Sequence, residues 1–168
     1  MGNLKKLIFA GALAALCCVG TLLISIPFPG TGGYFNLGDC FVIISGVILG
    51  PVYGFLAAAI GSMFADVFAS FAIYAPGTFV IKGLMALVVG LMFYKNRKTL
   101  FAILSAVIAE VIMVAGYFIY EVILTGSISM AVLSITGNLM QALAGAVISV
   151  VFILLITKNK AINKFFFK

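Results

Sequence analysis

Long apolar runs, separated by short breaks rich in Gly, Pro or charge, dominate this sequence. A helix needs about 20 apolar residues to cross a bilayer core of about 30 Å, and several runs approach this pattern. They are Leu4–Ile26, Leu37–Leu49, Val52–Ser70, Thr78–Tyr94, Leu100–Leu124 and Met130–Thr157. The pattern predicts an all-α fold in which residues 1–168 form one domain, a bundle of six transmembrane helices.

The second run is short for a membrane span, because as a helix it extends only about 20 Å. It is also consistent with the first half of one bent helix over 37–70, which would leave five spans. Six spans place nine of the ten basic residues on one side, as the positive-inside rule requires, whereas five spans divide them. The nine are Lys5, Lys6, Lys95, Arg97, Lys98, Lys158, Lys160, Lys164 and Lys168. We therefore expect six spans with both termini in the cytoplasm.

Composition supports an integral membrane protein, with 65% hydrophobic and 8% charged residues. The chain has no His and only three Cys, so we expect no metal site, no cofactor, no catalytic residue and no enzymatic activity. The net charge of +6 comes from the cytoplasmic side and indicates contact with anionic lipid rather than nucleic acid. The terminal segment KNKAINKFFFK is expected to lie at that membrane surface. The start of the chain resembles a signal peptide but lacks a suitable cleavage site, which favours a retained first span.

Five ionisable residues remain outside the cytoplasmic set: Asp39, Asp66, Lys82, Glu110 and Glu121. The topology puts Asp39, Asp66, Lys82 and Glu121 toward the outer side and Glu110 near mid-membrane. A charge at the bilayer centre costs at least about 2.5–3.5 kcal/mol, so such residues usually face a bundle interior or a wet cavity.

Helical spacing places further polar residues on shared faces. Tyr117 lies between Glu110 and Glu121 in a 4, 3, 4 pattern that also includes Val114. The next span repeats this pattern with Ser134, Asn138, Gln141 and Gly145. These stripes predict a polar-lined pocket that opens to the outside.

The pattern leaves the role of each residue open. Asp39 follows Asn36, a plausible helix cap, so it either stabilises the first turn or contacts a ligand. Lys82 either pairs with Asp66 or contacts the ligand directly. Glu121 either lines the pocket or extends to the outer surface. Asn138 and Gln141 are equally consistent with hydrogen bonds between helices.

Two other features bear on function. Small residues recur four apart in the first span, as Ala10 with Ala14 and Gly11 with Ala15, which permits close helix packing inside the bundle or against another membrane protein. The outer loop Pro27–Asn36 contains two Pro and three Gly and ends in aromatic residues. It is interpreted either as a connector or as a lid over the pocket.

The segments IPFPGTGGYFNLGDCFVIISGVILGPVYGFLAAAIGSMFADV and YAPGTFVIKGLMALVVG resemble the S components of energy-coupling factor (ECF) vitamin transporters. The six-span plan and the small-residue first helix extend this resemblance over nearly the whole chain. It implies a prokaryotic, multi-pass protein of the cell membrane that binds one vitamin-like molecule at its outer side. It also implies docking on a membrane coupling subunit that carries two ATPase subunits, through Ala10, Gly11, Ala14 and Ala15.

Within this family, the run from Phe35 to Gly38 and the segment YAPGTFVIKGLM look most like the branch for pyridoxine-type or hydroxymethylpyrimidine substrates, related to the riboflavin branch. Riboflavin is the alternative substrate, and an ion-coupled secondary carrier using Glu110 and Asp66 is the alternative mechanism. The residues expected to bind the substrate are Tyr34, Asn36, Asp39, Asp66, Lys82, Glu110, Tyr117, Glu121, Asn138 and Gln141.

Overall fold

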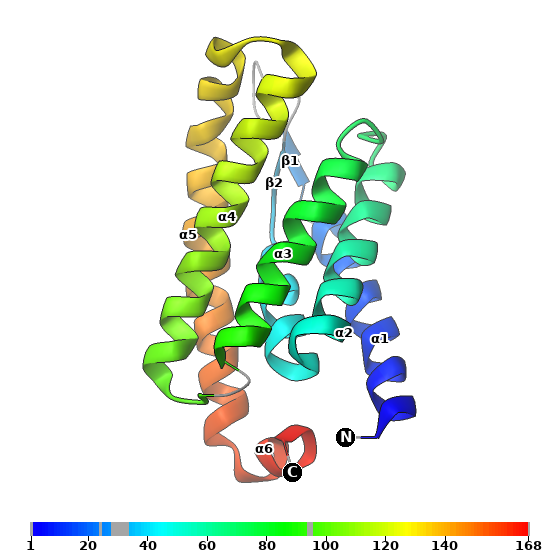
Figure 1. Ribbon diagram of the computed structural model, residues 1–168, viewed down its shortest axis with the longest axis vertical. Coiled ribbons are helices and arrows are strands. Elements are labelled where there is room, and N and C mark those ends of the chain that lie inside the picture. The colour runs from blue at the N-terminus through cyan, green and yellow to red at the C-terminus, as the bar shows by residue number, and fades with distance from the viewer. Residues whose placement is uncertain (1, 24, 28–33, 94–95, 168) are drawn as a thin grey trace.

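The computed structural model describes residues 2–23, 25–27, 34–93 and 96–167, with only the backbone given for 25–27 and 34–35. The described chain is a helical bundle, completed by a short hairpin and a terminal helix (Figure 1). The elements are α1 (Asn3–Leu23), β1 (Ser25–Pro27), β2 (Tyr34–Asn36), α2 (Gly38–Phe68), α3 (Ala75–Phe93), α4 (Thr99–Thr125), α5 (Ile128–Lys158) and α6 (Lys160–Phe167). The predicted all-α bundle is therefore confirmed, and the hairpin is the one addition to it.

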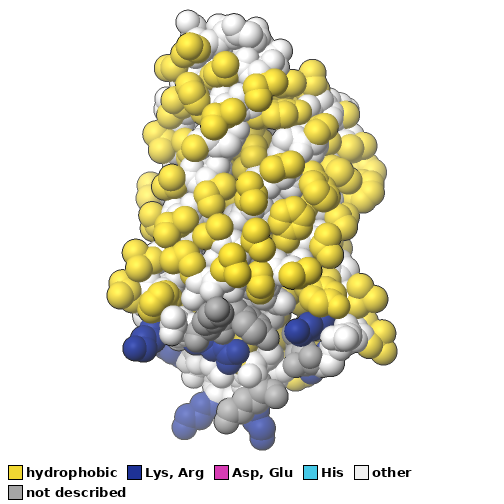
Figure 2. Space-filling model, in the orientation of Figure 1, with side chains coloured by type: hydrophobic (Ala, Val, Ile, Leu, Met, Phe, Trp, Pro, Cys, Tyr) yellow, Lys and Arg dark blue, Asp and Glu magenta, His cyan; other side chains and the backbone are white. Residues whose placement is uncertain are grey.

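The helices α1 to α5 are each long and apolar enough to cross a membrane. Large apolar side chains such as Leu143, Val111 and Ile123 are more than half exposed, and apolar groups cover most of the face seen in Figure 2. In a bilayer such groups lie against lipid chains rather than water, so the protein needs to bury fewer of them.

Helix α2 contains two of the predicted spans, because its direction reverses at Gly50. Gly50 has φ 78° and ψ −172°, which is outside the helical region, and Pro51 begins the second half. The halves 38–49 and 51–68 then lie side by side: a Cβ placed on Gly54 would come within 2.8 Å of the Gly46 Cα. This reversal confirms the arrangement of six helical segments and explains why the second one is short.

The basic residues gather at one end of the molecule. Figure 1 places both termini at this end, and Figure 2 shows the Lys and Arg side chains of this face clustered there. The Lys5 Nζ lies 3.6 Å from the centre of the Phe165 ring, which ties the start of α1 to α6. This arrangement agrees with two termini on the cytoplasmic side.

Helix α6 packs more closely on the bundle than the sequence suggested. The Phe9 and Phe166 rings lie 5.4 Å apart, and Arg97 stacks over Phe167 at 4.2 Å. The aromatic residues of this segment therefore contact protein as well as the membrane surface.

The hairpin connects α1 to α2. Strands β1 and β2 are antiparallel, with Ser25 opposite Asn36 and Pro27 opposite Tyr34. Residues 28–33, the centre of the loop interpreted as a lid, lie outside the described residues. The described part brings Asn36 to the start of α2 and thereby positions the site.

Candidate functional site

Polar side chains are concentrated inside the bundle where α2, α3, α4 and α5 meet. Most of the predicted substrate-binding residues are buried there, although they come from distant parts of the chain. The buried members of this set are Asn36, Asp39, Asp66, Lys82, Glu110, Glu121 and Gln141. Polar groups in the interior of a membrane bundle are expensive, so this concentration marks the candidate site.

Helix α2 begins inside the bundle, and this sets the depth of Asp39. The Asn36 Oδ1 accepts a hydrogen bond from the Gly38 N–H at 2.9 Å, which caps the start of the helix although Leu37 is the N-cap residue. Asp39 follows in the first turn and has an exposed fraction of 0%. Asp39 is close to Gly145, near the middle of α5. The expected position of Asp39 at the outer mouth is therefore wrong: this carboxylate lies deep in the bundle.

Asp39 is bound by two side chains. The Lys82 Nζ forms an ion pair with its Oδ1, and the Gln141 Nε2 donates to its Oδ2 at 2.7 Å. Lys82 therefore pairs with Asp39, a partner that the sequence had not offered for it. The pairing satisfies two buried charges and joins three helices.

Gln141 extends this network to the hairpin. Its Oε1 accepts from the backbone N–H of Asn36 at 3.0 Å and from the Asn36 Nδ2 at 3.1 Å. Because the same amide donates to Asp39, Gln141 uses both ends of its side chain and fixes the start of α2 against α5.

Tyr117 borders the ion pair. The Lys82 Nζ lies 5.3 Å from the centre of the Tyr117 ring, within cation–π range, and the Tyr117 hydroxyl is 2.9 Å from the Thr78 Oγ1. Thr78 was not among the predicted site residues, although it lies one helical turn before Lys82 and so shares its face.

Glu110 differs from Asp39 because neither of its carboxylate oxygens has a hydrogen-bond partner among the described residues. Its exposed fraction is only 4%. The Oε1 lies against Gly145 so closely that a Cβ at this position would collide with it. Gly145 thus provides the space for this carboxylate.

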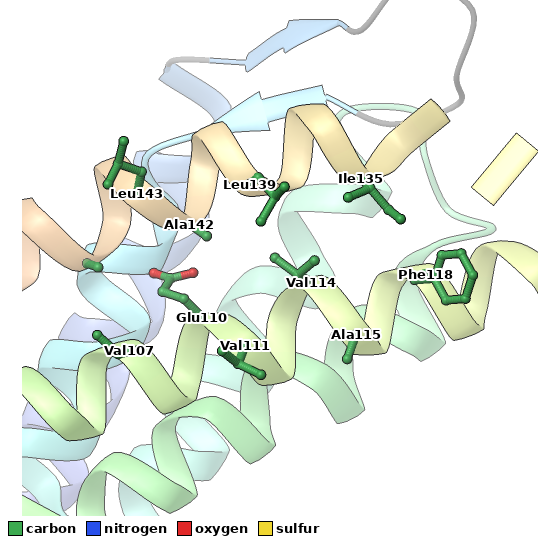
Figure 3. Close-up of a pocket in the computed structure, with 11 residues that line it drawn as sticks. Val107, Glu110, Val111, Val114, Ala115, Phe118, Ile135, Leu139, Ala142 and Leu143 are labelled. Atoms are coloured by element: carbon green, nitrogen blue, oxygen red, sulfur yellow. The ribbon is translucent and has the colours of Figure 1, made fainter. Parts of the chain in front are cut away.

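Glu110 lines a groove of about 520 Å³ between α4 and α5. In Figure 3 its carboxylate faces α5 across the gap, near Ala142 and Leu143. The other lining residues are all apolar: Val107, Val111, Val114, Ala115, Phe118, Ile135, Leu139, Ala142, Leu143 and Ala146. The groove opens on the side of the bundle, so it differs from the polar-lined, outward-opening pocket that the sequence predicted.

A second polar group lies toward the outer end. The Tyr74 hydroxyl donates to the Glu121 Oε1 at 3.2 Å, and Glu121 is 3% exposed, so it does not extend to the outer surface. Asp66 is 4% exposed on the second half of α2, and its backbone carbonyl accepts from the Phe71 N–H at 2.8 Å. Tyr74, which was not among the predicted site residues, binds Glu121.

Among the described side chains, that of the predicted residue Asn138 stays outside this network. Asn138 is half-buried, because Gly137 takes the buried position on that turn of α5. The backbone of Tyr34 is in β2, but its side chain lies outside the described residues.

The small residues of α1 divide between two faces. Ala10 is buried, and Ala14 packs so tightly on Gly61 that a Cβ on Gly61 would collide with its carbonyl. Gly11 and Ala15 are exposed. Of the four predicted docking residues, only Gly11 and Ala15 are therefore on the outer face of the described bundle.

The residues described contain no group of three or more Cys, Asp and Glu side chains that could hold a metal ion. The available chemistry is binding: an ammonium paired with a carboxylate, an amide, a phenol, and the carboxylate of Glu110.

Known proteins resemble this chain over most of its length. A protein of Pyrococcus woesei described as "Uncharacterized protein in gap 3'region" is 33% identical over 132 residues, covering 77% of this chain and 86% of that protein. The thiamine precursor transporter HmpT of Lactococcus lactis subsp. cremoris (strain MG1363) is 27% identical over 164 residues, covering 97% of this chain and 94% of that protein.

Solved structures share the fold. The S component for biotin from an ECF-type ABC transporter, at 18% identity, covers 100% of both chains with a TM-score of 0.72. A second S component of a bacterial ECF transporter, at 21% identity, has a TM-score of 0.66 and covers 92% of this chain and 94% of that one.

A family model provides the assignment. The model described as "ECF-type riboflavin transporter, S component" matches residues 1–158. This is a family of transport proteins rather than enzymes, and the five long apolar helices agree with a multi-pass protein of the cell membrane. The chain belongs to the family of ECF-type riboflavin transporter S components.

Proposed function

We propose that this protein is the substrate-binding subunit of an ATP-driven ECF importer and captures a small heteroaromatic vitamin or vitamin precursor at the extracellular side. The observation that carries the proposal is the buried network of Asn36, Gln141, Asp39 and Lys82 beside Glu110. A bundle that needed only stability would gain little from so many buried polar groups. Binding of a polar ligand would explain why these buried polar groups are present.

The proposed substrate class is pyridoxine-type compounds or hydroxymethylpyrimidine. The similarity to a thiamine precursor transporter supports the second compound, and the riboflavin description of the family supports riboflavin as the alternative. A small ring with polar substituents suits a site in which a few polar groups lie among apolar walls.

The proposed partners are a membrane coupling subunit and two ATPase subunits. The exposed face of α1 around Gly11 and Ala15 supports docking, since small residues let a second helix approach closely. This surface lies on the opposite side of α1 from the buried Leu13 and Cys17.

Calorimetry on the purified protein tests the proposal with pyridoxine, hydroxymethylpyrimidine, thiamine and riboflavin as ligands. We expect tight binding of one ligand and weaker binding after Gln141→Leu, which removes the hydrogen bonds to Asp39 and Asn36. Ser149→Ala is the matched control, because Ser149 is also buried on α5 but donates only to Ala146 of its own helix. If the purified protein bound none of a wider panel of vitamins, the proposal would be wrong.

An ion-coupled carrier is the second candidate, and the observation that favours it is the carboxylate of Glu110, which has no hydrogen-bond partner in the described part of the chain. This mechanism predicts uptake into proteoliposomes driven by an ion gradient with no ATPase subunits present. A strict requirement for ATP and the ATPase subunits would remove this candidate.

A further inference from the structure

The carboxylate of Glu110 has an unmet requirement for hydrogen-bond donors. It is buried, and neither oxygen has a partner among the residues described. Buried polar groups in native proteins are nearly always satisfied by protein, water or ligand. Asp39, close by, already has Lys82 and Gln141, so it does not share this requirement.

The position of Glu110 gives a ligand access to it. The carboxylate lies in the groove between α4 and α5, whose volume of about 520 Å³ is in the range of small-molecule sites. Figure 3 shows it between the apolar side chains of both helices, with Val114 and Leu139 further along the groove. The apolar walls can pack against the two faces of a flat ring, while the carboxylate can accept hydrogen bonds from donors on the edge of that ring.

A lipid chain would fill the groove less well. Val111, Leu139 and Leu143 are more than half exposed, so lipid can reach the opening. An acyl chain, however, has no hydrogen-bond donor and would leave both oxygens of Glu110 unsatisfied in an apolar environment. The occupant must provide donors where the carboxylate lies.

We infer that Glu110 is the specificity-determining residue of this site and binds the amino-pyrimidine edge of the substrate, namely a ring nitrogen next to an exocyclic amino group. This inference rests on the proposed function and narrows it to aminopyrimidines. A carboxyl group and such an edge form two parallel hydrogen bonds. The amino N–H donates to one oxygen, and a proton shared between the other oxygen and the ring nitrogen completes the pair.

The local charge agrees with this choice. The ammonium of Lys82 is already paired with Asp39. An aminopyrimidine can meet Glu110 in either protonation state, as a ring cation beside a carboxylate or as a neutral ring beside a carboxylic acid. A pyridoxine-type ring has hydroxyl groups but no amino group beside its ring nitrogen.

The test compares two ligands of the same size by calorimetry. One is 4-amino-5-hydroxymethyl-2-methylpyrimidine, and the other is the analogue in which oxygen replaces the amino group. We expect the wild-type protein to bind the amino compound at least about tenfold more tightly, because a charge-assisted pair is lost with the oxo analogue. Glu110→Gln should weaken binding of the amino compound by about 10- to 100-fold.

The same variant should also largely abolish the preference. A carboxamide offers one donor and one acceptor, which can pair with the amino and ring-nitrogen edge of the amino compound and with the N–H and C=O edge of the oxo analogue, so the ratio of the two affinities should fall toward one. A purely structural role of Glu110 would lower the affinity for both ligands and leave their ratio unchanged. Ser105→Ala is the matched control, since Ser105 is buried on α4 and donates to Ala102 of its own helix. It should keep the wild-type ratio.

A second variant covers the case in which Glu110→Gln does not fold. Gly145→Ala places a methyl group against the Glu110 Oε1 and should reduce the preference for the amino compound by displacing the carboxylate. Equal binding of the two ligands by wild-type protein, or an unchanged ratio in Glu110→Gln, overturns this inference alone. Binding of pyridoxine or riboflavin without any aminopyrimidine binding does the same and leaves the proposed function standing. No binding of any vitamin overturns both.

Discussion

Lys82 of α3 and Asp39 of α2 form an ion pair in the interior of the bundle, where their side chains are 4% and 0% exposed. The pair joins the middle of the chain to the segment that follows the hairpin. Both residues were recognisable as membrane-buried charges, but each had another plausible role. In the structure, Lys82 and Asp39 are ion-pair partners.

Removing one partner of this pair should be more harmful than removing both. Lys82→Met leaves Asp39 buried without its cation, and breaking a buried pair in this way costs about 3–5 kcal/mol. The double variant Asp39→Asn with Lys82→Met removes both charges and should recover more than half of this loss. Thermal unfolding of the purified proteins in detergent measures the difference.

Lys98→Met serves as the control for this series, because Lys98 is exposed at the basic end. It should unfold like the wild-type protein. A double variant less stable than Lys82→Met alone would contradict the interpretation that the pair compensates two buried charges.

The helices were predictable from the sequence because each must cover a bilayer with apolar side chains. The reversal at Gly50 was also predictable, although the second run is short, because the positive-inside rule requires an even number of spans here. The position of Lys5 beside Phe165 agrees with that reasoning. Hydropathy and charge thus determine the order and direction of the segments.

The partners inside the bundle were not predictable to the same degree. The sequence offered Asp66 or the ligand as the partner of Lys82 and did not consider Asp39, because the pairing depends on how far β2 brings the start of α2 into the bundle. A strand of three residues has no hydropathy signature. On α5 the spacing grouped Asn138 with Gln141, yet packing turns Gly137 inward and leaves Asn138 half-buried.

Gly50 should tolerate substitution poorly because of its backbone conformation. Its φ of 78° and ψ of −172° lie in a region that is almost restricted to glycine, so Gly50→Ala should destabilise the protein by about 1–3 kcal/mol. Gly126 is the comparison: its φ of 65° is left-handed, and a Cβ there meets nothing within 4 Å. Gly126→Ala should cost only about 1 kcal/mol. If Gly50→Ala and Gly126→Ala lowered the stability equally, the backbone conformation of Gly50 would not be specifically restricted to glycine.

The reversal at Gly50 also makes a prediction about topology. With six segments, the turn between α4 and α5 is extracellular and α6 is cytoplasmic. A cysteine at the exposed Ser129, in the first turn of α5, should react with a membrane-impermeant maleimide on intact cells. A cysteine at the exposed Ala161 of α6 should react only after permeabilisation. The native Cys17 and Cys40 are buried and give little background, and the half-buried Cys18 is replaced by serine in both variants. Labelling of both new cysteines on intact cells would contradict the six-segment topology.

Substitutions on the exposed face of α1 and at its packed face should have different effects, the first on docking and the second on folding. Gly11→Val adds a side chain where no atom of the described structure lies within 4 Å, so the isolated protein should fold and bind its ligand normally. The added bulk should, however, block the approach of a coupling subunit and reduce uptake by cells that express the complete transporter to background. Gly61→Val is the counterpart, since its side chain would collide with Ala14 and overpacking costs about 1–3 kcal/mol. It should lower stability and ligand binding together. Normal uptake by Gly11→Val would place the docking surface on another helix, because a protein that binds and transports with this face obstructed does not use it.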